Sequence, residues 1–305
     1  MTTAYHIPVL LQPTIDALCI QPNGVYVDCT LGGAGHSKAI LEKLDNNGKL
    51  IVFDQDKDAL ANLPHDDRII AIHQNFMHIT KMLRLHHITQ VHGILADLGI
   101  SSHQIDEPSR GFAIRYNAPL DMRMDNRTTT TAAHILATYT EQALHKMLEQ
   151  YGEVTNAKTL AHNIATVRQS MPIATTDDLK HILEPYAKGN PNKYYAQVFQ
   201  ALRIAVNEEL QALKVLLAQV PALLYPQGRV AIITFHSLED RIVKNYFKKG
   251  IYSEAEAAID YNPFDNTPKT YPLRPTTKKP IEATPEEIKE NPRSRSAKLR
   301  VAIKN

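Results

Sequence analysis

Three short apolar segments of the sequence each end in an aspartate, and these carboxylates are the first candidates for chemistry. The segments are residues 25–27, 50–53 and 93–96, and they are followed by Asp28, Asp54 and Asp97. Carboxylates that leave parallel strands gather at one edge of a sheet, where they can accept hydrogen bonds from a ligand. The spacing therefore predicts a site for a polar ligand at that edge.

A glycine-rich segment, residues 28–37 (DCTLGGAGHS), follows the first of these strands. Glycines let the backbone approach a ligand closely, and the start of the next helix offers free amides. A dinucleotide motif G-x-G-x-x-G read from Gly33 has Lys38 in place of its third glycine, which argues against a pyrophosphate cofactor. Asp54 has the position of an acid that binds both ribose hydroxyls of a nucleoside. A plain tight turn before a capped helix is the alternative.

The segment from Asp97 to Ser102 leaves the third aspartate-ended strand, where reacting groups of such sheets lie. Asp97 is expected to anchor the ligand or to polarise a substrate amine, although strand-end aspartates often only cap helices. The chain has 14 histidines, but those at 65, 73, 86 and 87 lack the spacing of metal ligands with a carboxylate partner. No catalytic metal is expected.

These residues need a scaffold, and the first hundred residues alternate apolar runs with helical patterns such as Ser37–Leu44. The alternation, with a further apolar run at 69–72, predicts a doubly wound α/β domain with a parallel sheet. From about 105 to 120 the chain is rich in Pro, Gly and Arg, which indicates an ordered loop.

Residues 131 to about 220 show only helical spacing. Within this stretch, Thr175–Asp178 resembles a capped helix start, and apolar residues from Val198 to Leu217 mark one long amphipathic helix. A buried type of strand returns at 229–235. We therefore predict a sheet domain formed by residues 1–105 and 221–305, interrupted by an inserted all-helical domain of residues 106–220.

The end of the chain combines an irregular stretch with positive charge. Residues 260–290 hold many prolines and predict an irregular excursion, and 298–303 could supply a last strand. The net charge is +2, but residues 271–305 carry nine Lys/Arg against four Glu. This basic end fits a polyanionic partner, with a solvated end or a structural strand as alternatives.

Composition limits the class of protein. With 43% hydrophobic and 22% charged residues, the chain is typical of a globular protein, and neither a signal peptide nor an uninterrupted apolar span is visible. Cys19 and Cys29 are the only cysteines, so no disulfide framework is expected. A cytoplasmic protein without membrane attachment follows as the expectation.

Several motifs resemble those of the bacterial 16S ribosomal RNA cytosine-N4 methyltransferases, the MraW or RsmH family. The blocks span nearly the whole chain in family order: 6–11 (HIPVLL), 35–37 (GHS), 97–104 (DLGISSHQ), 110–112 (RGF), 119–125 (PLDMRMD), 200–210 (QALRIAVNEEL), 235–244 (FHSLEDRIVK) and 291–300 (NPRSRSAKLR). Ala34 stands where many members have glycine, and alanine fits there provided that the backbone does not need a positive φ.

The resemblance implies a class I S-adenosylmethionine-dependent methyltransferase, with a Rossmann-like doubly wound sheet and an inserted helical domain that helps to recognise RNA. It implies a substrate, the N4 amine of one cytidine in the decoding region of 16S rRNA in the small ribosomal subunit, and leaves homodimer formation open. The family's contacts with S-adenosylmethionine transfer to Ala34, Gly35, His36, Asp54, Phe76, Asp97 and Gln104. Phe76 and Gln104 rest on the resemblance alone, and from its type Phe76 would be a core residue.

The reaction sets demands of its own. Cytosine N4 is a poor nucleophile because its lone pair is delocalised into the ring, so a site must accept hydrogen bonds from the amine and align it with the transferring methyl group. We expect Asp97 and the loop through Ser101 to do so. Asp121 is a further catalytic candidate, with Arg115, Arg123 and Arg127 facing phosphates. An internal salt-bridged turn is the alternative for Asp121.

Three other interpretations can be weighed against the sequence. His236 could border the pocket, although a helix start capped by Ser237, with Glu239 and Asp240 in its first turn, explains the segment as well. A nucleoside-dependent oxidoreductase is disfavoured by the missing third glycine. A non-enzymatic RNA-binding assembly factor is disfavoured by the intact glycine segment, Asp54 and Asp97.

Overall fold

The computed structural model describes residues 8–253, 255 and 271–305, and the chain divides into two compact units. The sheet unit comprises Met1–Gly99 and Leu210–Asn305, and the helical unit comprises Ile100–Glu209. Both boundaries lie upstream of the expected ones at 105/106 and 220/221. Within the described ranges, every helix is too short or too polar to cross a bilayer.

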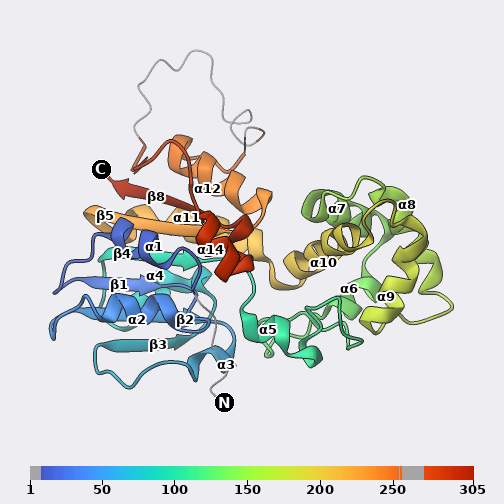
Figure 1. Ribbon diagram of the computed structural model, residues 1–305, viewed down its shortest axis with the longest axis horizontal. Coiled ribbons are helices and arrows are strands. Elements are labelled where there is room, and N and C mark those ends of the chain that lie inside the picture. The colour runs from blue at the N-terminus through green and yellow to red at the C-terminus, as the bar shows by residue number, and fades with distance from the viewer. Residues whose placement is uncertain (1–7, 254, 256–270) are drawn as a thin grey trace, which may run out of the picture. The chain divides into compact units, whose positions relative to one another are not determined.

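An eight-stranded sheet forms the centre of the sheet unit, in the order β3-β2-β1-β4-β5-β8-β6, with β7 also paired to β8. Its strands are β1 (Val25–Asp28), β2 (Lys49–Asp54), β3 (Ile69–His73), β4 (Val91–Asp97), β5 (Leu224–Thr234), β6 (Leu273–Pro275), β7 (Ile281–Glu282) and β8 (Lys298–Lys304). Strands β1 to β5 are parallel to one another, and β8 is antiparallel to its neighbours. Figure 1 shows this order, from β8 and β5 at the top of the sheet to β3 at its lower edge. The predicted fold class is confirmed.

The middle of strand β2 is apolar on both sides because both faces of the sheet are covered. In β2, Leu50 and Val52 contribute to one core cluster, whereas Ile51 and Phe53 contribute to the cluster on the opposite face. All four side chains are fully buried. Alternation along the strand therefore supplies two cores from one continuous apolar run.

Helices on each face complete the two cores. The cluster that contains Ile51 includes residues of α4 (Ile79–Leu85), α11 (Glu209–Leu223) and α12 (Ser237–Lys249). The cluster that contains Leu50 includes residues of α1 (Leu11–Leu18) and α2 (Gly35–Leu41). The remaining short elements of this unit are α3 (Lys57–Leu60), η1 (Phe76–His78), α14 (Pro285–Glu290) and η4 (Pro292–Ser296).

Helix α11 explains why the second boundary lies earlier than expected. Its residues Leu213, Leu217 and Val220 are buried in the core beneath the sheet, so the helix belongs to the sheet unit. The predicted single long helix from Val198 to Leu217 is wrong, because Glu208 adopts a left-handed conformation with φ 50° and ends α10. The apolar spacing continues across this break, and for that reason the sequence pattern did not reveal it.

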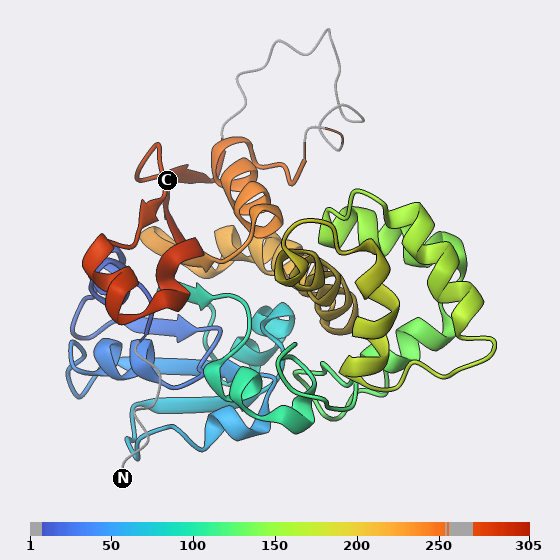
Figure 2. The same cartoon turned by 45° about the vertical axis from the view of Figure 1, so that its right-hand side comes forward.

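The helical unit has its own apolar core. Its elements are α5 (Ser102–Asp106), η2 (Pro108–Arg110), α6 (Ala132–Thr138), α7 (Glu141–Gly152), α8 (Ala157–Val167), α9 (Thr176–Leu183), η3 (Glu184–Tyr186) and α10 (Pro191–Asn207). Figure 2 shows these helices in green to yellow. Leu148, Leu160 and Leu202 lie fully buried in their common core. The predicted helix start at Thr175 is confirmed, with a reciprocal capping box to Asp178.

The last part of the chain is more regular than expected. Residues 260–270 of the predicted irregular excursion lie outside the described residues, but the rest of it contains β6, β7 and α14. The predicted last strand is confirmed as β8, which pairs with β5, β6 and β7. Leu299 and Val301 are buried, whereas Lys298 and Arg300 beside them are partly exposed, so the apolar side chains of this strand serve the core.

Candidate active site

The strand order reverses between β1 and β4, and ligands of doubly wound sheets bind beyond the strand ends at such a point. Asp28 ends β1, Asp54 ends β2 and Asp97 ends β4, as the sequence predicts. All three belong to the sheet unit, and Asp28 is paired in register with Val52 and Leu95 of the neighbouring strands. The carboxylates therefore leave adjacent parallel strands at one edge.

The glycine-rich segment is held by the backbone of the strands on both sides of β1. The Cys29 amide donates to the Leu95 carbonyl at 2.8 Å, and the Leu31 amide donates to the Phe53 carbonyl at 3.0 Å. Gly32 has φ 49° and Ala34 has φ 62°. The condition under which alanine fits at this position is not met, because Ala34 adopts the left-handed conformation that glycine adopts without strain.

Gly35 begins α2 at a point of close packing. A Cβ atom there would lie 2.6 Å from the Cγ atom of Pro8. Only glycine fits unless Pro8 moves, so the requirement for glycine comes from the chain that crosses the loop. His36, next in sequence, is buried.

The Asp54 carboxylate is oriented by two backbone amides. The Gly32 amide donates to its Oδ2 atom at 3.0 Å, and the Asp56 amide donates to Oδ1 at 2.8 Å. Burial raises the pKa of Asp54 to about 6, and these hydrogen bonds oppose the shift. A carboxylate oxygen can accept more than one hydrogen bond, so this carboxylate fits a pair of neighbouring hydroxyl groups such as those of a ribose.

Asp97 and His36 form a histidine–carboxylate pair at this edge of the sheet. Their nearest atoms, His36 Nδ1 and Asp97 Oδ2, are 3.7 Å apart. His36 Nε2 lies 3.1 Å from the Val9 carbonyl, which can only accept, so this nitrogen carries the proton and Nδ1 faces the carboxyl group. The Asp97 amide donates to Thr30 Oγ1 at 2.6 Å, which fixes the end of β4.

The second oxygen of Asp97, Oδ1, is buried and has no hydrogen-bond partner among the described residues. Burial raises the pKa of Asp97 well above its usual range, and the nearby charges of Asp28 and Glu239 add to the shift. A buried acceptor without a partner is costly, so it is suited to a cationic or hydrogen-bond-donating ligand group. The sulfonium and ammonium groups of S-adenosylmethionine, and an amine substrate, have this chemistry.

Asp28 has a structural role that the sequence interpretation missed. It is almost completely buried and accepts hydrogen bonds from Ser37 Oγ at 2.7 Å and the Thr30 amide at 3.0 Å. Burial raises the pKa of Asp28 to about 7, against the effect of these hydrogen bonds. The side chain joins β1 to both ends of the glycine-rich segment. Its position at a strand end was the available signal.

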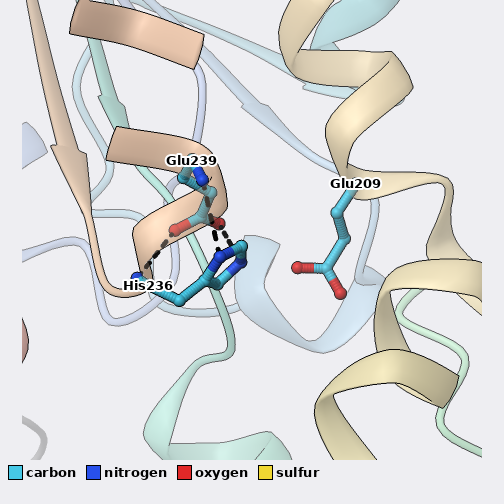
Figure 3. A group of neighbouring side chains, drawn as sticks. All are labelled: Glu209, His236 and Glu239. Atoms are coloured by element: carbon cyan, nitrogen blue, oxygen red, sulfur yellow. Dashed lines mark hydrogen bonds and ion pairs between the residues drawn. The ribbon is translucent and has the colours of Figure 1, made fainter. Parts of the chain in front are cut away.

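The partly buried His236 and the buried Glu239 form a second histidine–carboxylate pair, which Figure 3 shows at the start of α12. The His236 Nε2 and Glu239 Oε1 atoms are 3.1 Å apart. Glu239 Oε2 also accepts from the Phe235 amide at 2.9 Å, and the Glu239 amide donates to His236 Nδ1. The predicted cap at Ser237 is wrong: His236 itself is the N-cap, in a reciprocal capping box with Glu239. This pair therefore has a local structural explanation.

Phe76 begins η1 just beyond β3, and Asn75 caps this turn through the Met77 amide at 2.9 Å. The side chain is half-buried and packs against the core cluster on the α4 side of the sheet. Its position as a core residue is thus explained, and its contact with S-adenosylmethionine stays a prediction.

In the helical unit, Ser101 and Gln104 are tied to each other. Ser101 is the N-cap of α5: its hydroxyl accepts from the Gln104 amide at 3.2 Å, and Gln104 Oε1 accepts from the Ser101 amide at 3.0 Å. Gln104 is buried. The pair fixes the start of α5, and the Ser101 hydroxyl keeps one lone pair and its proton for a ligand.

Asp121 has the internal salt bridge that the sequence left as an alternative. Both of its oxygens accept from the Arg123 guanidinium, at 2.7 and 2.6 Å, and Oδ1 also accepts from the Arg123 amide. Burial alone would raise the pKa of Asp121, but the hydrogen bonds from Arg123 outweigh it, and the pKa of this carboxyl group is lowered. Arg123 also donates to the Thr128 carbonyl at 2.6 Å. This arrangement favours a structural role over contact with an amine.

Several of the basic residues that could meet RNA have partners within the protein. Arg127 pairs with Asp125 at 2.7 Å, and Arg115 pairs with Asp106 at 2.7 Å. In the C-terminal strand, Arg300 holds Asp240 of α12 through two hydrogen bonds of 2.6 and 3.1 Å. Arg300 therefore joins β8 to α12, which supports the structural alternative for this part of the chain.

Comparison with known proteins identifies the family. The family model described as the MraW methylase family matches residues 3–305. A protein of Flavobacterium johnsoniae named ribosomal RNA small subunit methyltransferase H is 49% identical over 304 residues, covering 99% of each chain. A protein of the same name from Cytophaga hutchinsonii is 50% identical over 302 residues, covering 98% of this chain and 99% of that protein.

Among solved structures, a putative rRNA methylase from Clostridium thermocellum has a TM-score of 0.42 at 11% identity, covering 98% of this chain and 97% of that one. Strand order supports the fold independently of this weak likeness. Motifs, strand order and identity along nearly the whole length agree. The chain belongs to the MraW methylase family, whose methyl donor is S-adenosylmethionine.

Proposed function

We propose that the protein methylates the N4 amine of a specific cytidine in the decoding region of 16S rRNA. The relatives' name, ribosomal RNA small subunit methyltransferase H, supports the substrate class. The structural observation that carries the proposal is the buried Oδ1 atom of Asp97 at the end of β4, which has no hydrogen-bond partner in the described part of the chain. A cytoplasmic location follows from this substrate.

S-adenosylmethionine supplies an activated methyl group, and residues of the sheet unit have the chemistry to hold it. Asp54 would accept hydrogen bonds from the ribose hydroxyls with its two carboxylate oxygens, which the Gly32 and Asp56 amides orient. Gly35 and His36 at the start of α2 would contribute backbone amides, with Ala34 as an adjoining contact, and Phe76 would pack beside the adenine ring. Gln104 is proposed as a further contact from the helical unit.

Asp97 is the residue that we expect to act on the amine. As N4 attacks, its delocalised lone pair must localise, and acceptor oxygens near its hydrogens favour that change. A cation nearby favours the ionised form of Asp97, so the bound methyl donor would lower the pKa of this carboxyl group. The loop through Ser101 is proposed to supply a second acceptor, and the helical unit is proposed to recognise the RNA around the target base.

Methyl transfer from labelled S-adenosylmethionine to small subunits lacking the modification tests the proposal. Digestion to nucleosides and mass spectrometry should place the label in N4-methylcytidine. Label in another nucleoside would overturn the target atom. Unlabelled RNA, despite normal binding of the donor, would overturn the substrate and point to another amine acceptor or to an assembly role.

Two variants make this test specific to the site. Asp97→Asn removes the negative charge but keeps the shape, and we expect turnover to fall by about a hundredfold or more, the scale of losing one preorganised transition-state contact. Asp67→Asn is the matched control, because Asp67 is exposed in the same unit. Full turnover and normal donor affinity in Asp97→Asn would rule out the assigned role.

A further inference from the structure

A surface on the sheet unit combines positive charge with the absence of acidic residues. From Arg68 to Ala96 the sequence contains no Asp or Glu. Helix α4 lies within this stretch and is followed directly by His86 and His87, both exposed. We define the α4 surface as the exposed residues His78, Lys81, Arg84, Leu85, His86 and His87.

Packing fixes which side of α4 faces outward. Ile79 and Leu83 are fully buried in the core beneath the sheet. Lys81, Arg84 and Leu85 occupy the other side, and Leu85 is 64% exposed, which is unusual for a large apolar side chain. The core therefore orients two cations and an apolar side chain outward from the same side of one helix.

The α4 surface borders a hollow of about 510 Å³, lined in part by His78, Lys81 and Arg84. Gln219 of α11 forms part of its wall and is itself fixed in place: it accepts from the Thr80 amide at 3.2 Å and donates to the Met77 carbonyl at 2.9 Å. The hollow is thus built on an anchored helix start within the sheet unit.

Neither Lys81 nor Arg84 has an ion pair or side-chain hydrogen bond within the described part of the chain. This separates them from Arg115, Arg123 and Arg300, whose charges are paired internally. Unpaired cations around a hollow, without acids in the same stretch, complement a chain of phosphates. The α4 surface contains no Phe, Tyr or Trp, the large rings on which bases stack most strongly, and its two lysine and arginine charges favour contact with the phosphate backbone.

We propose that the α4 surface binds the phosphate backbone of the ribosomal RNA substrate, as a contact separate from the methyl-transfer site. The proposal rests on the proposed rRNA substrate. Lys81 and Arg84 would each meet a phosphate, and Leu85 would pack against the adjoining sugar. Such contacts position the RNA without reading its sequence.

Affinity for a 16S rRNA fragment carrying the decoding region tests the proposal, measured by fluorescence anisotropy over a range of salt concentrations. The double variant K81A/R84A should bind about tenfold more weakly at 0.1 M salt, and the slope of log affinity against log salt should decrease by about 2. The variant K43A/K49A is the charge-matched control, since both lysines are exposed in the same unit. The affinity of either variant for S-adenosylmethionine should be unchanged.

The outcomes separate this proposal from the proposed function. If K81A/R84A binds RNA as the control does, the α4 surface is not an RNA site, whether or not the wild type methylates RNA. If the wild type binds RNA but transfers no methyl group, the proposed function fails, and the affinity difference still decides the role of the α4 surface. If the wild type binds phosphatidylglycerol vesicles and K81A/R84A does not, while the RNA affinity of the two proteins is the same, the α4 surface is a membrane contact and the proposal is overturned.

Discussion

At the scale of single residues, the strand-end carboxylates combine burial with few compensating charges. Asp28, Asp54 and Asp97 all have raised pKa values, for which burial is the largest cause. Such groups make binding and stability depend on pH in a direction that can be worked out. The three residues differ in what their oxygens contact, so each has a separate test.

Asp28 should make the protein less stable as pH rises. Its pKa is raised from 3.8 to about 7 in the folded state, so the folded form binds the proton more tightly than the unfolded form. The stabilisation is complete below about pH 4 and is lost as pH rises towards 7. In Asp28→Asn, the free energy of unfolding, measured by urea denaturation, should therefore fall less steeply across this window. Parallel curves for the variant and the wild type would contradict the assignment.

Asp97 should release a proton when the methyl donor binds. The raised pKa of Asp97 favours its neutral form in the free protein, and a cation beside Oδ1 favours the ionised form. Affinity for S-adenosylmethionine should therefore increase with pH. Calorimetry in two buffers with different ionisation enthalpies would measure the released proton, and Asp97→Asn should abolish this contribution. If the difference in binding heat between the two buffers is the same for the wild type and for Asp97→Asn, the proton is released by another group.

Asp54 should contribute to donor affinity rather than to turnover. Asp54→Asn replaces one acceptor oxygen by a donor, and loss of a charge-assisted hydrogen bond costs about 1.5–3 kcal/mol. The Kd for S-adenosylmethionine should rise about tenfold to a hundredfold, with little change in turnover at saturating donor. A matching change in Asp67→Asn would show that charge alone, rather than contact, is responsible.

The backbone conformation of Ala34 could not be predicted from the sequence pattern. The glycine-rich segment was recognisable, but the φ of 62° at Ala34 depends on the turn that its amide makes with the Leu31 carbonyl. Asp121 is similar: the spacing of Asp121 and Arg123 was visible, whereas their pairing depends on where the two side chains point. Residue types and strand ends could be predicted from the sequence, but backbone conformation and side-chain pairing depend on the three-dimensional fold.

Ala34→Gly should stabilise the protein, because the left-handed conformation costs alanine about 1–2 kcal/mol. The greater chain entropy of glycine offsets part of this, so we expect a net gain of about 0.5–1 kcal/mol in the free energy of unfolding. Ala39→Gly in α2 is the control, and it should lose about 1 kcal/mol because that residue lies within a right-handed helix. Destabilisation by both substitutions would show that packing of the Ala34 methyl group outweighs the strain.

At the scale of elements, the sequence predicted strands better than helix ends. Continuous apolar runs marked the strands β1 to β5, since a strand covered on both faces needs little else. The sequence does not predict the break between α10 and α11 at Glu208, because the apolar residues on both sides of it keep helical spacing. The cap of α12 was placed one residue late, since Ser237 is the more usual capping type.

The cap of α12 provides a test at this scale. His236→Ala removes the side chain that accepts from the Glu239 amide, and we expect a loss of about 1 kcal/mol in the free energy of unfolding. His236→Asn should retain most of that stability, because asparagine is a strong N-cap. If His236→Asn keeps its stability but loses turnover, His236 has a role in the reaction, and the purely structural explanation fails.

At the scale of the whole molecule, each unit has a core of its own. We therefore expect Leu160→Ala, in the helical unit, to destabilise that unit by about 2–5 kcal/mol and to split thermal unfolding into two transitions. S-adenosylmethionine at a hundredfold excess over Kd should stabilise the other transition by about 2.7 kcal/mol. Calorimetry with and without the donor measures both effects. A single transition in the variant would show that the units unfold together.

The placement of β8 between β5 and β6 has a consequence for biosynthesis. Residues 100–209 form one continuous stretch, so the helical unit can fold on the nascent chain as soon as it has left the ribosome. The sheet cannot be completed at that stage of synthesis, because β4 pairs with β5 and β5 pairs with residues 298–304, which are synthesised later. At about 5–20 residues per second, the edge of β4 stays open for on the order of ten seconds. An apolar strand edge exposed for that time is an aggregation hazard, so the growing chain is a natural client for chaperones that shield it.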